Sequence, residues 1–326
     1  MAEQIAASAH RALGLVIAKS KSMGSLPYEC YSKLYDSLVQ SVIDYGACVW
    51  GVRDFDCIKA VQHRAIRFFL GVHKKTANAA ILGEMGWTPQ KVIQQMCICR
   101  QFCRYSKMDE RRLNLHVIKW ALNANCDNWI NKVKHLYVNL DLEYLMDFEI
   151  PHGKSDVKML KHKLLIQFEE VWKAELSRIE GRRGIGLNKL RTYRLFKNKY
   201  HTEEYVKNRY IRYSERKALA QIRCGSAAIA IETGRFKNGR YLPCDERVCP
   251  ICTLGVEDEF HVLMMCNFYE DIREELFEYA NVNHPYFSDL NDQEKFIFLV
   301  SHVDIVQYTA KACRQILVRR KHYVMN

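Results

Sequence analysis

The strongest constraint on this chain is the spacing of its apolar side chains, which recur every three or four positions over long unbroken stretches. This is the period of an α-helix that buries one face. Prolines and glycines, which interrupt helices, number only six and fifteen among 326 residues. The pattern is clear at Tyr31, Leu34, Tyr35, Leu38, Val39, Val42 and Ile43. We therefore predict a mostly α-helical protein.

The predicted helices end at recognisable stop signals. Glycine next to the last apolar position is typical of a helix C-terminus, as at Gly46 and Gly71. The expected helices span 2–20, 31–45, 54–70 and 78–82, a longer one runs from 87–89 to about 105, and further helical patterns fill 110–180.

Four potential metal ligands lie near the C-terminal end in a C-x₂-C-x₈-H-x₄-C array, formed by Cys249, Cys252, His261 and Cys266. Thiolate and imidazole are the ligands of structural Zn²⁺, and four protein ligands leave no position for water. Pro250-Ile251 suits the tight turn of the first pair, and the acidic segment 257–261 suits the first turn of a helix carrying the second pair. We predict a structural Zn²⁺ site. Cys244 is an alternative ligand, and unrelated thiols in a cysteine-rich chain are the competing interpretation.

Thirteen cysteines would suit disulfides in a small secreted chain, but the N-terminus lacks the basic start and apolar run of a signal peptide. No apolar stretch approaches the length of about 18 residues that is needed to span a bilayer. We expect an intracellular protein of the nucleus or cytoplasm, not secreted, with most thiols packed as small apolar groups. Cys97, Cys99 and Cys103 have no histidine at ligand spacing and are expected in the core.

The chain is basic, with 49 Lys and Arg against 37 acidic residues and a net charge of +12, which favours polyanionic partners such as RNA or DNA. Residues 181–217 hold twelve Lys/Arg, three acidic residues and six interleaved aromatic rings. Two interpretations stay open: phosphate contacts with rings stacked on bases, or an amphipathic helix with core rings and solvated cations. The candidate phosphate contacts are Arg182, Arg183, Arg191, Arg194, Lys197 and Lys199.

Residue patterns of known catalytic centres are missing. A polymerase holds two Mg²⁺ ions with paired carboxylates, and the sequence contains no Asp-Asp pair. It also contains no H-E-x-x-H helix, and a zinc site with four protein ligands is closed to substrate. We therefore expect that this chain is not an enzyme.

Several motifs stand in a characteristic order. They are D-Y-G-A-C-V-W-G at 44–51, L-G-E-M-G-W-T-P at 82–89, R-T-Y-R-L-F-K at 191–197, I-E-T-G-R-F at 231–236, and then the Cys/His array. Together they resemble the C-terminal part, from thumb to zinc knuckle, of the reverse-transcriptase polyprotein of non-LTR (LINE-type) retrotransposons. The resemblance spans roughly residues 10–275, and its last part is the most specific.

The resemblance implies a helical thumb that grips a template–primer duplex and a terminal knuckle that helps to hold RNA or DNA. In the thumb-like part, it implies that Arg64, Arg67, Lys74 and Lys75 face the duplex backbone. Polymerase activity is not implied, because the palm and endonuclease of that family have no counterpart here. The resemblance does imply contact with a separate or missing polymerase palm. Near the knuckle we favour a structural role for Glu232.

We thus expect a truncated, retroelement-derived protein that binds nucleic acid non-specifically and carries a structural zinc site. The alternatives are a zinc-stabilised helical protein-interaction module and a non-functional fragment of a reverse transcriptase. The predicted regions are a thumb-like part at 1–108, a helical connector at 109–180, a basic aromatic-rich segment at 181–243, a CCHC zinc knuckle at 244–276 and a C-terminal helical tail at 277–326.

Overall fold

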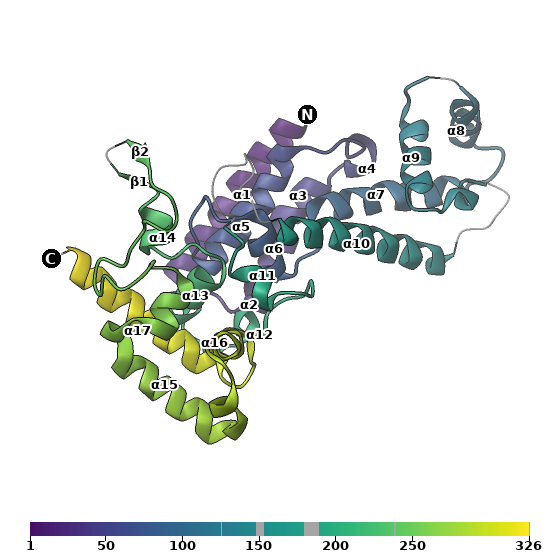
Figure 1. The fold of residues 1–326 in the computed structure, drawn as a ribbon. Coiled ribbons are helices and arrows are strands. Elements are labelled where there is room, and N and C mark those ends of the chain that lie inside the picture. The colour runs from purple at the N-terminus through teal and green to yellow at the C-terminus, as the bar shows by residue number, and fades with distance from the viewer. Residues whose placement is uncertain (125, 148–152, 179–188, 238, 326) are drawn as a thin grey trace. The chain divides into compact units, whose positions relative to one another are not determined.

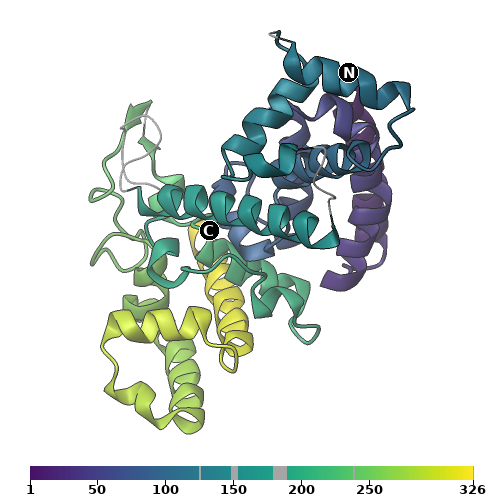
Figure 2. The ribbon, with the colours of Figure 1, turned by 90° about the vertical axis from the view of Figure 1, so that its right-hand side faces the viewer.

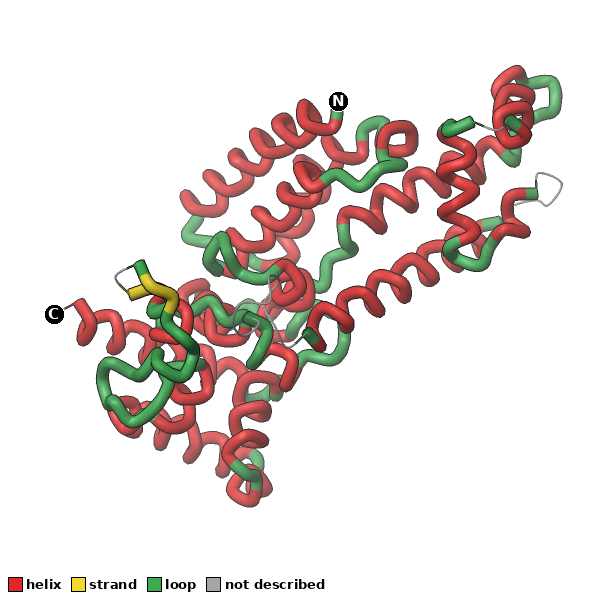
Figure 3. Tube along the Cα trace, turned by 45° about the horizontal axis from the view of Figure 1, so that its top comes forward, coloured by secondary structure: helices red, strands yellow, loops and turns green. Residues whose placement is uncertain are grey.

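The computed structural model describes the chain except for residues 125, 148–152, 179–188, 238 and 326. The described chain is mostly helical, and its named strands form a single short hairpin (Figure 3). This confirms the prediction of a mostly α-helical protein that ends in a C-terminal helix. The candidate contacts Arg182 and Arg183 lie outside the described residues.

The elements are labelled in Figure 1, with η for turns of 3₁₀ or π type. The first half contains α1 (Ala2–Ser22), α2 (Tyr28–Leu34), η1 (Tyr35–Gln40), α3 (Ser41–Asp44), α4 (Ala47–Trp50), α5 (Asp56–Leu70), α6 (Asn78–Met85), α7 (Gln90–Tyr105), α8 (Leu113–Asn123), α9 (Trp129–Val138), η2 (Glu143–Met146) and α10 (Lys154–Ser177). The second half contains α11 (Tyr193–Phe196), α12 (Glu204–Lys207), α13 (Tyr213–Arg223), α14 (Ala230–Thr233), β1 (Phe236–Lys237), β2 (Arg240–Tyr241), η3 (His261–Met265), η4 (Asn267–Tyr269), α15 (Glu270–Asn283), η5 (Pro285–Asp289), α16 (Asp292–Ser301) and α17 (Val306–Met325).

The predicted helix boundaries of the N-terminal part agree with the structure. α1, α5, α6 and α7 occupy the expected ranges, and α2, η1 and α3 follow one another without a break over 28–44. Gly46 and Gly71 follow helix ends with φ of 67° and 68°. Because this left-handed region strains residues that carry a Cβ, these glycines end the helices where the sequence predicts.

The chain divides into two compact units, each built from several segments. Unit 1 comprises 1–21, 32–62 and 88–172, and unit 2 comprises 22–31, 63–87 and 173–326. The five regions expected from the sequence follow chain order, which this division does not test, so they stay a prediction.

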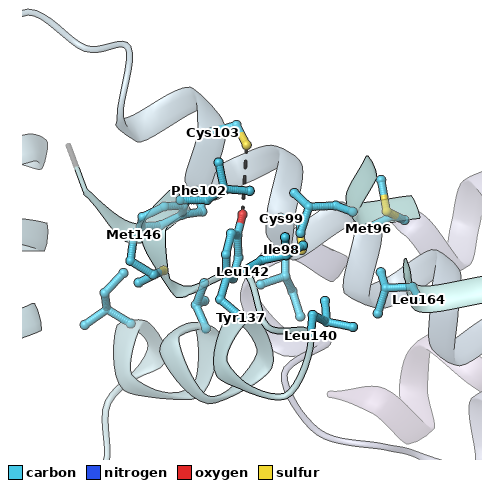
Figure 4. Close-up of a cluster of buried hydrophobic side chains, with 14 of the residues drawn as sticks. Met96, Ile98, Cys99, Phe102, Cys103, Tyr137, Leu140, Leu142, Met146 and Leu164 are labelled. Atoms are coloured by element: carbon cyan, nitrogen blue, oxygen red, sulfur yellow. Dashed lines mark hydrogen bonds between the residues drawn. The ribbon is translucent and has the colours of Figure 1, made fainter. Parts of the chain in front are cut away.

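The core of unit 1 gathers apolar side chains of α7, α9, η2 and α10 (Figure 4). Cys99 and Cys103 are buried in it, and the Cys103 sulfur lies 4.0 Å from the hydroxyl of Tyr137. Burial raises the pKa of Cys99 to about 12, which keeps this thiol neutral. The expectation that these cysteines pack in the core is confirmed for Cys99 and Cys103, while Cys97 is half-buried.

The core of unit 2 contains a buried guanidinium, that of Arg223 at the end of α13, which is only 1% exposed. Its Nε and Nη2 each donate to the Glu84 carboxylate of α6 at 2.8 Å. Nη2 also lies 2.8 Å from Glu203, and Nη1 donates to the carbonyl of Val300 in α16. One side chain therefore joins four separate parts of unit 2.

The carboxylates around Arg223 have further partners of their own. Glu203 also accepts from the ammonium of Lys197, and Glu84 accepts from the hydroxyl of Tyr205. The Phe196 ring lies 4.6 Å from the Arg223 guanidinium carbon, close enough for a cation–π contact. Buried charges are tolerated when each is paired and hydrogen-bonded, and the cost appears when a partner is removed.

We predict that Arg223→Leu destabilises the protein by about 3–5 kcal/mol, because it leaves buried carboxylates without their main counter-charge. Urea unfolding followed by circular dichroism measures the change. The matched control is Arg209→Ala, which removes an exposed arginine paired with Glu29 at 3.3 Å, and surface pairs contribute at most about 1 kcal/mol. Equal effects of the two substitutions would contradict a central role for Arg223.

Candidate metal centre

The four predicted ligands converge in unit 2. The ligand atoms of Cys249, Cys252, His261 and Cys266 all lie within 4.8 Å of one another. The Cys252 sulfur and the His261 Nε2 are 3.3 Å apart. Tetrahedral bonds of about 2.3 Å to sulfur and 2.0–2.1 Å to nitrogen place such atoms about 3.6 Å apart. The cluster can therefore hold a metal ion with small adjustments of the side chains.

The first ligand pair lies in a tight turn closed by backbone hydrogen bonds. The Cys249 N–H donates to the Gly255 carbonyl at 2.8 Å, and Val248 and Val256 form an antiparallel bridge. The Thr253 N–H donates back to the Cys249 carbonyl at 3.0 Å. Backbone N–H groups of Ile251 and Cys252 also point at the Cys249 sulfur, where they stabilise a thiolate.

The second ligand pair depends on a π-type turn, η3. Five steps of an α-helix at about 100° each would place Cys266 about 140° away from His261. Instead, the Cys266 N–H donates to the His261 carbonyl at 2.8 Å, an i to i+5 bond that brings both ligands to one side. Asp258 starts this helix by accepting from the His261 N–H at 2.7 Å.

Burial shifts the pKa values of the ligand side chains. Burial raises the pKa of Cys249, and it raises the pKa of Cys266 to about 12. Burial lowers the pKa of His261, so its imidazole is neutral and can donate a lone pair at neutral pH. Thiols with raised pKa values become thiolates only when a cation replaces their protons, so metal binding must release protons here.

A buried ion pair connects the segment 249–266, which carries the four potential ligands and is called the metal turn below, to the C-terminal helix α17. Glu257 is 0% exposed, and its carboxylate accepts from Arg320 Nε at 2.5 Å and from Nη2 at 2.6 Å. The same carboxylate accepts from the Ala230 N–H at the start of α14. The acidic residues at 257–259 therefore do more than favour a helix start, because Glu257 anchors two other elements.

Glu259, the second buried carboxylate of this segment, anchors residues 191–192. It accepts from Arg191 Nη2 at 2.6 Å and from the Thr192 hydroxyl at 2.8 Å. Arg191 also contacts Glu232, which pairs with Lys189 at 2.8 Å and with Arg235 at 2.7 Å. The expected structural role of Glu232 near the cysteine cluster is confirmed, and Arg235 shares it.

These pairs engage two of the candidate phosphate contacts, Arg191 and Lys197. Arg191 is engaged by Glu259 and Glu232, and Lys197 is 3% exposed beside Glu203. Their charges neutralise buried carboxylates, so these two side chains do not form part of a solvent-facing strip. Arg194 is half-buried and Lys199 is exposed.

The aromatic rings of the same segment also divide into two groups. Tyr193 and Tyr205 are fully buried, as the core interpretation expects. Tyr210 is 84% exposed, and Tyr213 lies at the start of α13 with 37% exposure. Base stacking therefore has no support from Tyr193 or Tyr205.

The cations of the thumb-like part lie in and after α5. Arg64, Lys74 and Lys75 are exposed. Arg67 is half-buried and donates to the Thr76 carbonyl at 2.8 Å and to Asn78 at 2.5 Å. Its guanidinium thus closes the loop after Gly71, which differs from the expected contact with a duplex.

The residues that surround the four potential ligands could not be found from the sequence. Arg320 and Glu257 are separated by 63 positions, and Arg247 donates to the carbonyls of Ile231 and Leu242 while being 3% exposed. No local spacing marks such partners. None of the helices in the described ranges is long and apolar enough to cross a bilayer.

We predict one metal ion bound by thiolates per chain. Cobalt substitution should produce a sulfur-to-cobalt charge-transfer band, and Cys252→Ser should weaken or abolish it because one of three sulfurs is lost. Cys244→Ser should leave the band unchanged, since Cys244 does not belong to the cluster. Loss of the band in Cys244→Ser would transfer the ligand role to that residue.

A second prediction concerns acid stability. Burial alone would raise the pKa of Glu232, but Lys189, Arg235 and Arg191 hold it below its ordinary value of 4.5. A lowered pKa stabilises the fold fully above the unfolded value, and this stabilisation is lost as the pH falls through the folded value. Glu232→Gln should therefore cost about 1–3 kcal/mol at neutral pH, and the difference should shrink below about pH 4.

Urea unfolding of both proteins over this pH range measures the difference. Glu246→Gln, at an exposed position of the same region, is the control and should match the original protein throughout. A difference for Glu232→Gln that does not change with pH would contradict the ion-pair explanation.

Comparison with known proteins identifies no relative: no family model, no curated protein and no solved structure matches this chain.

Proposed function

We propose that this protein binds the phosphate backbone of RNA or DNA at a basic groove of unit 2, and that its cysteine–histidine cluster holds a structural Zn²⁺ ion. The position and charge of this groove are the observations that carry the proposal. An origin in a non-LTR retroelement belongs to the same proposal and is supported by the order of the sequence motifs.

The groove lies between α13 and α17, which run side by side (Figure 1). It encloses about 430 Å³. α13 contributes Tyr213, Lys217 and Gln221, and α17 contributes Arg314 and Lys321. Its size and its open form suit an extended strand.

The charge of the groove supports an anionic ligand. Lys217, Arg314 and Lys321 are exposed, and the groove lining contains no carboxylate among the described residues. Arg320 also lies there, but Glu257 neutralises it. Three exposed cations in a lining without a carboxylate can release counterions from phosphates, and the ring of Tyr213 lies at the groove for a base to stack on.

The chemistry of the ligand set supports zinc. Three sulfurs and one imidazole nitrogen form the Cys₃His set of structural zinc sites, and four protein ligands make a closed site. The metal site is also connected to the groove, because Glu257 of the metal turn forms an ion pair with Arg320 of α17. Structural Zn²⁺ contributes on the order of 10 kcal/mol to small units, so its removal should disorder residues 245–275 and loosen this wall of the groove.

A protein-interaction module is the second candidate, and exposed apolar side chains of unit 1 favour it. A hollow of about 470 Å³ is lined by Ile5 and Ser8 of α1 and by Val42 and Tyr45 at the end of α3. Tyr45 is 82% exposed. Self-association or partner binding lost in Tyr45→Ser, with nucleic-acid binding unchanged, would support this second candidate.

We predict that the triple variant Lys217→Ala, Arg314→Ala and Lys321→Ala binds single-stranded RNA or DNA at least about tenfold more weakly at low salt, because three phosphate contacts are lost. Fluorescence anisotropy over a range of salt concentrations measures the effect. The salt dependence of log K should fall by about 2, since each contact to a single strand contributes about 0.7.

The matched control is Lys154→Ala, Lys158→Ala and Lys161→Ala on α10, where all three lysines are exposed. It removes the same net charge outside the groove and should retain most of the affinity. Equal losses in both triple variants would show that only the total charge matters, and no binding by the unaltered protein would overturn the proposal.

A further inference from the structure

A second group of potential metal ligands lies in unit 2 apart from the cysteine cluster. Ligand atoms of His284, His302 and Asp304 all lie within 4.8 Å of one another. We propose that these three residues bind a second divalent transition-metal ion, in a site with an open coordination position.

The three residues are brought together by the packing of the last helices. His284 directly follows the last residue of α15, and His302 directly follows the last residue of α16. Asp304 follows in the turn that leads into α17. Since α17 packs against both α15 and α16 (Figure 2), this turn lies beside the end of α15.

The facing ring nitrogens have no hydrogen-bond partner. His284 Nε2 and His302 Nδ1 are both buried and unpaired among the described residues. Each lies 3.8 Å from the same oxygen, Oδ2 of Asp304, which is too long for a hydrogen bond. Ligands bound at about 2.0–2.2 Å stand about 3.0–3.6 Å apart around an ion, so each nitrogen-to-carboxylate distance of 3.8 Å is only slightly longer than a metal site requires.

The rings are held in this orientation by their other contacts. The second nitrogen of His284, Nδ1, lies 3.4 Å from the hydroxyl of Tyr286. The His302 ring stacks on Phe298, with centroids 4.4 Å apart and an interplanar angle of 26°. Metal-binding histidines commonly direct their second nitrogen to such a partner, which orients the ring.

The two histidine rings lie close enough to bind the same divalent ion. Their ring centroids are 4.5 Å apart, so two imidazolium charges would repel each other beside a single carboxylate. A divalent ion instead uses both rings in their neutral form, and the Asp304 carboxylate balances part of its charge.

The donor set indicates which ions would bind. Two imidazole nitrogens and one carboxylate oxygen suit Zn²⁺, Co²⁺ or Ni²⁺, whereas Mg²⁺ and Ca²⁺ prefer oxygen ligands. Three protein ligands leave at least one position for water, in contrast to the closed Cys₃His cluster. The Asp304 side chain is 65% exposed, so this position is within reach of solvent.

Cobalt titration of the zinc-loaded protein tests the proposal. The full chain, first given one equivalent of Zn²⁺, should bind one further Co²⁺ with visible d–d absorption and without a sulfur-to-cobalt band. The missing sulfur band separates this site from the cysteine cluster. If the zinc-loaded protein binds no further Co²⁺, or only with a sulfur band, the proposal is wrong.

Two variants locate the second ion. His302→Phe keeps a ring to pack on Phe298 and should lose Co²⁺ binding, while Asp304→Asn, at an exposed position, should weaken it at least about tenfold. The control His322→Ala, at an exposed position of α17, should bind normally. Thermal unfolding verifies that the variants fold, and binding that persists in both Asp304→Asn and His302→Phe overturns the assignment.

Discussion

A guanidinium buried in a protein interior must find partners for all its donors, and Arg223 imposes this requirement on unit 2. Its bonds to Glu84, Glu203 and Val300 fix the relative positions of α6, the segment before α12, α13 and α16. Because Glu84 and Arg223 lie 139 residues apart, this pair forms only when the whole unit folds. A bidentate arginine–carboxylate pair is also directional, so it selects one arrangement of these helices.

The same principle recurs around the cysteine cluster, where Glu257 and Glu259 are both fully buried. Glu257 binds Arg320 of α17 and Glu259 binds Arg191, so the metal turn lies between two distant parts of the chain. Such pairs stabilise little when exposed, but breaking them in the interior is costly. This arrangement connects the small cysteine–histidine cluster to the larger helical unit around it.

Buried pairing also decides which cations can reach a ligand. Arg191 and Lys197 neutralise internal carboxylates, whereas Lys217, Arg314 and Lys321 are exposed at a groove without acidic residues in its described lining. Net charge and local density of basic residues therefore indicated a polyanionic partner but did not distinguish buried, paired cations from exposed ones. The proposed nucleic-acid contact consequently moves from the 181–199 segment to α13 and α17.

Local patterns were sufficient for the helices and for the Cys/His cluster, because helix period, glycine stops and ligand spacing act over a few residues. They correctly anticipated α1, α5 and α7 and the clustering of Cys249, Cys252, His261 and Cys266. The π-turn at η3, the partners of Arg223 and Glu257, and the meeting of His284 with His302 depend on contacts between distant segments. Only the tertiary structure could decide them, because the sequence around a charged or ligating side chain does not show which distant residue will pack against it.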